Sequence, residues 1–204
     1  MSRPEQVIRL AIAGASGKMG TEVARAACRQ EDIELVAAID LSRVGESLKT
    51  VAGNACPDLT IEDKLGAALD RTQPNVLVEL THPGAAADHA LVALKRGIAP
   101  IIGTSGISSE DLREIKRVSE ESATPAMVVP NFAVGAVLMM RFAEMAARWL
   151  PDVEIVEMHH DQKLDAPSGT ARATAERIDR ARRERPRSIR GEMVKVEGAR
   201  GGNV

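Results

Sequence analysis

Short apolar segments alternate with longer segments of helical period through the first 130 residues of the chain. Parallel strands need long crossover connections, usually helices, so this alternation is typical of βαβ units around a parallel sheet. Strands are predicted at Ile8–Ala13, Leu35–Asp40, Leu59–Ile61, Val76–Leu80, Pro100–Gly103 and Ala126–Val129. Helices are predicted at Gly20–Arg29, Glu62–Asp70, Ala85–Arg96 and Ser108–Ser122.

The pattern changes after residue 130, which predicts a second domain. A long apolar helix is expected from Val134 to Leu150, followed by a strand from Val153 to Met158. A further helix is expected from Gly169 to about Arg185. We therefore predict an α/β protein whose domains cover residues 1–130 and 131–204.

Composition argues against several classes of partner. The 27 basic and 29 acidic residues give a formal charge of -2, which provides no overall field to attract nucleic acid or anionic lipid. Two Phe, one Trp and no Tyr leave few side chains for stacking on bases. The N-terminus has no apolar signal core, and no apolar run approaches about 18 residues. We expect a cytoplasmic protein that binds neither nucleic acid nor membrane, with Cys28 and Cys56 as reduced thiols.

A glycine-rich turn follows the first predicted strand and opens the first predicted helix. Glycines allow a tight turn and a close approach of backbone to a pyrophosphate, whose charge is met by N–H groups at the helix N-terminus. A turn without a ligand could carry the same glycines, so the context matters. The predicted pyrophosphate site is Gly14-Ala15-Ser16-Gly17-Lys18-Met19, followed by Gly20.

Asp40 ends the second predicted strand, 20 residues beyond Gly20. A carboxylate at this place can accept hydrogen bonds from the adenine ribose, although Asp is also a common turn residue. Leu41 stands where an arginine would neutralise the 2′-phosphate of NADPH, so NADH is slightly favoured as cofactor. NADPH stays open, because Lys18 and Arg43 are close enough in sequence to reach that phosphate.

Two further loops follow predicted strands at their carboxyl ends, where open α/β sheets bind ligands. Each could be a plain connecting loop, but together with the glycine turn they outline a wall for the nicotinamide half of the cofactor. These segments are Gly103-Thr104-Ser105 and Val129-Pro130-Asn131-Phe132.

A polar segment near residue 160 carries the candidate chemistry. His159 and His160 would point to opposite sides in an extended chain, and Lys163 follows closely. No third ligand has suitable spacing for a metal, so none is predicted, although a purely structural role for the histidines stays open. An anion site at a helix N-terminus, or simply a helix cap, is predicted at Ser168-Gly169-Thr170.

The chain resembles the 4-hydroxy-tetrahydrodipicolinate reductases of lysine and diaminopimelate biosynthesis. The string HHDQKLDAPSGTA is similar to that family's signature, and GASGKMG, GTSG and PNFAVGAVLMM resemble its other segments in the same order. The resemblance implies a Rossmann-like dinucleotide-binding domain at 1–130 and a smaller α+β domain for substrate binding and oligomerisation at 131–204. It further implies a homotetramer and transfer of hydride from the nicotinamide to a small cyclic dicarboxylate.

The resemblance also implies roles for individual residues. His159 would donate or accept a proton and Lys163 would be a second proton donor. The substrate carboxylate would be held by His160, Ser168, Gly169 and Thr170.

The sequence departs from the family at its C-terminus, which resembles the loop before further strands of the second domain. We therefore expect a fragment or a short form with an incomplete second domain. Two alternatives stay open: a non-catalytic dinucleotide-binding or assembly protein, and another amino-acid-related Rossmann dehydrogenase.

Overall fold

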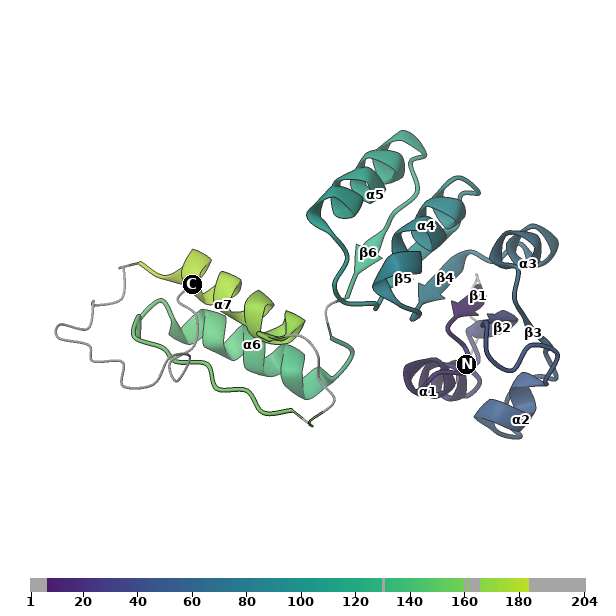
Figure 1. Cartoon of the computed structure of the whole chain (residues 1–204), viewed down its shortest axis with the longest axis horizontal. Coiled ribbons are helices and arrows are strands. Elements are labelled where there is room, and N and C mark those ends of the chain that lie inside the picture. The colour runs from purple at the N-terminus through teal and green to yellow at the C-terminus, as the bar shows by residue number, and fades with distance from the viewer. Residues whose placement is uncertain (1–6, 130, 160, 162–165, 184–204) are drawn as a thin grey trace. The chain divides into compact units, whose positions relative to one another are not determined.

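The computed structural model describes residues 7–129, 131–159, 161 and 166–183. The chain divides into two compact units, Met1–Val129 and Pro130–Val204. Figure 1 labels the helices and strands of both units, which are described separately below.

The first unit is built on a parallel sheet of six strands in the order β3-β2-β1-β4-β5-β6. Chain order reverses between β1 and β4, which creates the switch point where such sheets bind ligands. The strands are β1 (Ile8–Ala13), β2 (Ile33–Ile39), β3 (Ile61–Glu62), β4 (Val76–Glu79), β5 (Ala99–Ile102) and β6 (Met127–Val128).

Helices cover both faces of this sheet, which explains why its central strands are apolar at successive positions. On one face, Leu10 and Ile12 of β1 belong to a buried cluster with Ala24 of α1. On the other face, Ala11 and Ala13 belong to a cluster with Leu69 of α3. The helices of this unit are α1 (Lys18–Ala27), α2 (Leu48–Ala52), α3 (Leu65–Thr72), α4 (Pro83–Leu94) and α5 (Ser109–Glu121).

The predicted elements of the first unit all occur; β1 has its predicted bounds, and the other elements have one or both ends shifted by a few residues. One helix was not predicted: α2 has only five residues and begins after Ser47, whose side chain accepts a hydrogen bond from the backbone N–H of Lys49. A helix of about one turn is too short to show an apolar period in the sequence. Among the described residues, no helix has the length and apolarity needed to cross a membrane.

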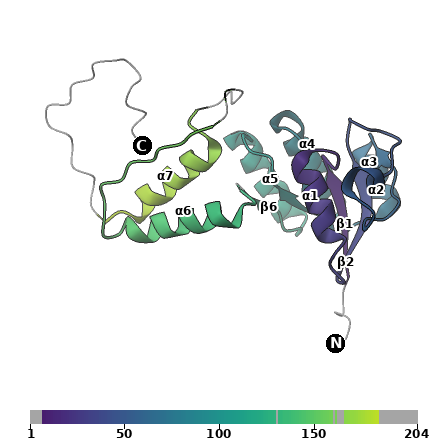
Figure 2. The same ribbon diagram turned by 90° about the horizontal axis from the view of Figure 1, so that it is seen from below.

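The described part of the second unit consists of two helices packed against each other, α6 (Val134–Ala146) and α7 (Gly169–Ala181). Figure 2 shows them side by side. Met140 of α6 and Ile178 of α7 are buried, and Arg177 Nη1 lies 3.4 Å from Glu144 Oε2. Helix α6 ends four residues before the predicted Leu150.

The strand predicted at Val153–Met158 is wrong, since the structure assigns no strand to these residues. A strand is defined by its ladder of hydrogen bonds with a neighbour. No strand lies beside this segment in the described part of the second unit. The β-branched residues Val153, Ile155 and Val156 favour an extended backbone, but they do not indicate whether a partner strand is present.

Candidate functional site

The glycine turn joins β1 to α1 at the carboxyl edge of the sheet. Gly14 has a φ of +83°, and a Cβ placed there would lie 2.6 Å from the carbonyl oxygen of Leu80. A Cβ on Gly20 would lie 1.9 Å from the Gly14 carbonyl oxygen, so the strand and helix meet only because both residues lack side chains. Gly17 is different, because its Cβ would be 3.4 Å from the same oxygen, an ordinary contact. The fold does not itself require glycine at position 17.

The N-terminus of α1 is exposed and has no side-chain cap. Gly17 is the N-cap and makes no side-chain capping hydrogen bond, while Gly17, Lys18 and Met19 are exposed. The first N–H groups of a helix have no partner within the helix, and the helix dipole adds positive potential there. The predicted pyrophosphate segment therefore has the form that a phosphate group requires.

Asp40, which follows β2, contacts the glycine turn directly. Its Oδ2 accepts a hydrogen bond of 2.9 Å from the backbone N–H of Ser16, and its Oδ1 accepts one of 2.9 Å from Ser42. Partial burial raises the pKa of this carboxyl, but the hydrogen bonds from Ser16 and Ser42 outweigh it and lower the pKa below its ordinary value. Asp40 is thus an anion at neutral pH, and its hydrogen bond from Ser16 also stabilises the glycine turn. Leu41 beside it is 80% exposed.

The ends of β4 and β5 form the next part of the same edge. Thr104 Oγ1 donates a 2.5 Å hydrogen bond to Glu79 Oε2, and the N–H of Gly103 donates to the Glu79 carbonyl oxygen. Ser105 is exposed, and the N–H of Val129 donates to the carbonyl oxygen of Ile102. The structure therefore places Gly103, Thr104, Ser105 and Val129 beyond the carboxyl ends of adjacent strands. Asn131 and Phe132 belong to the second unit.

His159 in the second unit lies near a carboxylate that sequence reasoning gave no role. Its Nδ1 is 3.8 Å from Glu157 Oε2, within ion-pair distance when the imidazole is protonated. The other oxygen of Glu157 accepts a 2.9 Å hydrogen bond from the N–H of Ser168. Glu157 thus links the histidine to the start of α7. Its position two residues before His159 was a usable signal, because alternate residues share a side in an extended chain.

The segment predicted to bind a carboxylate lies at the N-terminus of α7. Ser168 is the N-cap, and its Oγ accepts a 3.1 Å hydrogen bond from the N–H of Ala171. Thr170 Oγ1 accepts a 3.2 Å hydrogen bond from Asn131 Nδ2, while Asn131 Oδ1 accepts one from the N–H of Ala133. Because Asn131 supplies the donor, the hydroxyl proton of Thr170 remains available to a ligand oxygen. Pro130, His160 and Lys163 lie outside the described residues.

Other chemical groups of the described residues do not form a competing centre. No group of three or more His, Cys, Asp or Glu side chains suited to a metal occurs among them. Cys28 and Cys56 are free, and burial together with the neighbouring Cys56 thiol raises the pKa of Cys28 to about 12. Such a thiol is almost entirely protonated at neutral pH and is a poor nucleophile.

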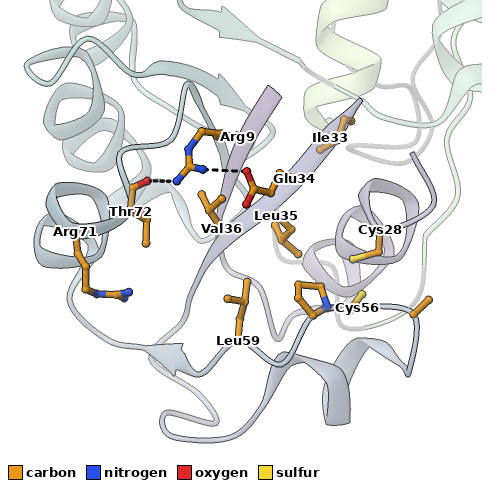
Figure 3. A pocket seen from close by; sticks show the side chains of 12 residues that line it. Arg9, Cys28, Ile33, Glu34, Leu35, Val36, Cys56, Leu59, Arg71 and Thr72 are labelled. Carbon is orange, nitrogen blue, oxygen red and sulfur yellow. Dashed lines mark hydrogen bonds and ion pairs between the residues drawn. The ribbon is translucent and has the colours of Figure 1, made fainter. Parts of the chain in front are cut away.

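A shallow pocket of about 660 Å³ lies beside these cysteines (Figure 3). Its walls include Arg9, Ile33 and Glu34, which belong to the amino-terminal halves of β1 and β2. Arg9 is already engaged there, with Glu34 Oε2 at 2.9 Å and the carbonyl oxygen of Thr72 at 2.7 Å. Gly14 and Asp40 follow the opposite ends of the same strands, so this pocket lies away from the predicted dinucleotide site.

A parallel sheet with a glycine turn after its first strand and an acid after its second defines a Rossmann-type dinucleotide-binding protein. GenD2 from gentamicin A biosynthesis, solved in complex with NAD, shares the fold at a TM-score of 0.57 and 16% identity, over 72% of this chain and 42% of that one.

Closer relatives define the family. A family model described as the N-terminus of dihydrodipicolinate reductase matches residues 8–132, and one described as its C-terminus matches residues 135–204. The 4-hydroxy-tetrahydrodipicolinate reductase of Syntrophomonas wolfei is 45% identical over 98% of this chain and 75% of its own length. The Bacillus pumilus protein of the same name is 44% identical over 96% of this chain and 73% of its own.

A solved structure agrees with these matches. The dipicolinate-bound dihydrodipicolinate reductase of Paenisporosarcina sp. TG-14 superposes with a TM-score of 0.76 at 40% identity, covering 98% of this chain and 76% of that chain. The chain belongs to the dihydrodipicolinate reductase family of pyridine-nucleotide-dependent oxidoreductases.

Proposed function

We propose that this chain reduces 4-hydroxy-tetrahydrodipicolinate to tetrahydrodipicolinate with NADH or NADPH, in lysine and diaminopimelate biosynthesis. The observation that carries the proposal is the similarity to reductases of that name along almost the whole chain, 45% identical over 98% of it. It extends over both units, so the cofactor and substrate parts of the reaction are supported together.

The first unit is proposed to bind the dinucleotide along its carboxyl edge. The pyrophosphate is assigned to the segment Gly14 to Met19, where the N–H groups of Gly14 to Gly17 already donate within the protein and those of Lys18 and Met19 begin the helix. Asp40 suits the adenine ribose, and Gly103 to Ser105 with Val129 suit the nicotinamide half. Pro130, Asn131 and Phe132 keep their assignment to the nicotinamide half from the sequence. The exposed Gly17 leaves space for a ligand that a side chain would fill. When bound, the reduced nicotinamide supplies the hydride. NADH is proposed as the slightly preferred form, because Asp40 is anionic and Leu41 offers no positive charge.

The second unit is proposed to bind the cyclic dicarboxylate and move its protons. His159, with Glu157 Oε2 at 3.8 Å from its Nδ1, would exchange a proton with the substrate, because an imidazole can both donate and accept one. Lys163 and His160, assigned from the sequence, would be a second proton donor and a substrate-carboxylate ligand. The Thr170 hydroxyl and the N–H groups of Gly169 and Thr170 would hold a carboxylate, while Ser168, whose own N–H donates to Glu157, would shape this site as the helix cap.

A direct assay tests this function. The purified chain is mixed with reduced cofactor and the cyclic substrate, and the absorbance of the reduced nicotinamide is followed while the product is identified by mass. The proposal predicts substrate-dependent oxidation of the cofactor and a product that has gained a hydride and a proton and lost one water, so that its mass is lower by one oxygen atom. Cofactor binding without oxidation would instead support a non-catalytic dinucleotide-binding protein. Oxidation only with other amino-acid-related substrates would support a different dehydrogenase.

A homotetramer and a cytoplasmic location are proposed from the resemblance to the family. The apolar surface of the second unit supports an interface between copies, because Phe142, Met145 and Trp149 are 62%, 63% and 71% exposed. Light scattering of the purified chain measures the oligomeric state directly.

A further inference from the structure

Glu79 is a fully buried carboxylate at the carboxyl end of β4, where its side chain has 0% exposure. A buried charge is costly unless hydrogen bonds compensate it. The proposed function assigns this residue no task, although it lies at the switch point where β1 and β4 are neighbours.

The carboxylate of Glu79 is satisfied from two loops and one helix. Its Oε1 accepts hydrogen bonds from the backbone N–H of Thr81, at 3.0 Å, and from the Thr81 hydroxyl. Its Oε2 accepts the hydroxyl of Thr104 at 2.5 Å, and His89 Nδ1 of α4 lies 3.4 Å from Oε1. Burial raises the pKa of Glu79, but the hydrogen bonds from His89, Thr104 and Thr81 outweigh it and lower the pKa below its ordinary value.

The two loops held in this way form part of the ligand-binding edge. Residues 80 and 81 lie directly behind the glycine turn, since a Cβ on Gly14 would meet Leu80 O at 2.6 Å and Thr81 N at 3.2 Å. Thr104 lies in the loop after β5, whose Gly103 donates its N–H to the Glu79 carbonyl oxygen. Glu79 therefore connects, through its own main chain and side chain, the segment behind the pyrophosphate turn and the loop proposed for the nicotinamide.

We propose that Glu79 is a positioning residue for the dinucleotide: its buried carboxylate holds the Thr81 and Thr104 loops in their ligand-binding conformation before the cofactor arrives. A carboxylate suits this role because it only accepts hydrogen bonds, so the hydroxyl protons of Thr81 and Thr104 are both directed to it. The inference rests on the proposed function. It adds that cofactor affinity depends on a residue that does not contact the cofactor. Without the Glu79 carboxylate, the Thr81 and Thr104 loops would have to become ordered during binding, which costs binding free energy.

Glu79→Gln tests this role, because it keeps the size of the side chain but removes the charge and turns one acceptor into a donor. NADH binding is measured by calorimetry far below the melting temperature of each protein. The dissociation constant is expected to rise by about tenfold or more, while kcat at saturating cofactor stays within about threefold of the parent. In the free protein, the backbone N–H of Thr81 is expected to exchange with solvent faster in the variant than in the parent.

Ile115→Ala is the matched control, because it truncates a buried side chain of α5 that makes none of these hydrogen bonds. It should lower the melting temperature without changing the dissociation constant for NADH. A folded Glu79→Gln protein with unchanged NADH affinity and unchanged Thr81 exchange would show that Glu79 only stabilises the fold, and would overturn the inference.

Thr81→Val provides a second test if Glu79→Gln does not fold. It removes one hydroxyl donor and leaves the carboxylate its other partners. Its dissociation constant for NADH should rise by at least about threefold, and a folded variant with the affinity of the parent would contradict the positioning role. A parent chain that binds neither NADH nor NADPH would overturn the proposed function as well. If the parent binds the cofactors and Glu79→Gln binds them with the same affinity, only the positioning role is overturned.

Discussion

The three glycines of the first turn meet different constraints. Gly14 and Gly20 are required by the protein itself, because a Cβ on either would lie within 2.6 Å of a backbone oxygen. Gly17 has an ordinary φ of -71° and room for a Cβ, and it lies at the exposed N-terminus of α1. Only at Gly17 can the need for glycine arise from a ligand and not from packing.

Gly17→Val is therefore expected to fold and to lose cofactor. The added side chain would lie where the pyrophosphate approaches the helix, so the dissociation constant for NADH should rise by at least about tenfold. Gly20→Ala is the contrasting variant and should lower the free energy of unfolding by about 3 kcal/mol or more, because the turn must move. Calorimetry and chemical unfolding separate the two effects. Unchanged NADH affinity in a folded Gly17→Val protein would mean that the cofactor site is wrongly assigned.

His159 and Thr170 should differ in the kinetic constant that they control. His159→Gln should lower kcat by about 10²-fold or more, the usual size of a lost general acid or base. Thr170→Val should raise KM with little change in kcat, because a carboxylate contact stabilises the ground state and the transition state alike. Steady-state kinetics on the complete substrate pair measures both. A kcat within about threefold of the parent in both His159→Gln and Lys163→Ala would indicate a structural loop.

Cofactor preference should follow the charges after β2. NADH is expected to bind at least as well as NADPH, since the Asp40 anion repels a 2′-phosphate. Leu41→Arg should improve NADPH binding, and it costs little packing because Leu41 is 80% exposed. Titrations of both cofactors at one ionic strength decide this. A parent preference for NADPH above about tenfold, or about 1.4 kcal/mol, would contradict the prediction.

Sequence reasoning assigned no role to Glu79 and Glu157, which hydrogen-bond to predicted site residues and have no assigned ligand contact of their own. The glycine turn, Asp40 and the Ser168 cap were predictable because each has a local signature of spacing or position. The signals of Glu79 and Glu157 are weaker, because their partners Thr104 and Ser168 are 25 and 11 residues away in the chain, although Glu157 shares a side with His159 in an extended chain. An acid at the end of the apolar strand Val76–Glu79 was a weak signal of a buried partner, but the sequence does not identify that partner.

Two helices of the chain begin with the same cap, which permits a controlled comparison. Ser108 Oγ accepts a hydrogen bond from the N–H of Asp111, and Ser168 Oγ accepts one from Ala171. Ser108→Ala and Ser168→Ala should each cost about 1 kcal/mol of stability, measured by thermal unfolding. Only Ser168→Ala should raise KM for the dicarboxylate. Equal KM values in both variants would separate the start of α7 from substrate binding.

Helices and strands were predictable where the local sequence has a helical period, a continuous apolar run or a cap. They were not predictable where formation depends on pairing with another strand. Strand β1 agrees with its predicted bounds because Leu10 to Ala13 are buried on both faces and form a continuous apolar run. Val153–Met158 is rich in β-branched residues, as strands are, but it forms no strand among the described residues, because pairing with a neighbouring strand depends on the rest of the fold. Helix α7 agrees at its start, where Ser168 caps it, and ends at Ala181; the predicted end near Arg185 lies outside the described residues.

At the scale of the whole molecule, buried and hydrogen-bonded carboxylates should set the acid stability. The pKa values of Asp40 and Glu79 are lowered in the folded state, so the stabilisation is present above their unfolded pKa values, near 4, and is lost as the pH falls through the folded ones. The melting temperature should be nearly constant from pH 7 to about 5 and fall below about pH 4.5. Glu79→Gln should reduce this dependence. The same acid slope in both proteins would show that Glu79 is not ionised in the fold.

The hydrogen bond from Ser16 to Asp40 limits the routes by which cofactor preference can change during evolution. Replacing Asp40 to admit a 2′-phosphate would also release the N–H of Ser16, and with it one anchor of the turn that the pyrophosphate needs. A lineage that exchanged this acid would change two parts of the cofactor site in one mutation. Leu41 has no such second task, because its side chain is mostly in solvent. A substitution at position 41 can therefore change the preference between NADH and NADPH with less loss of structure than a substitution at position 40.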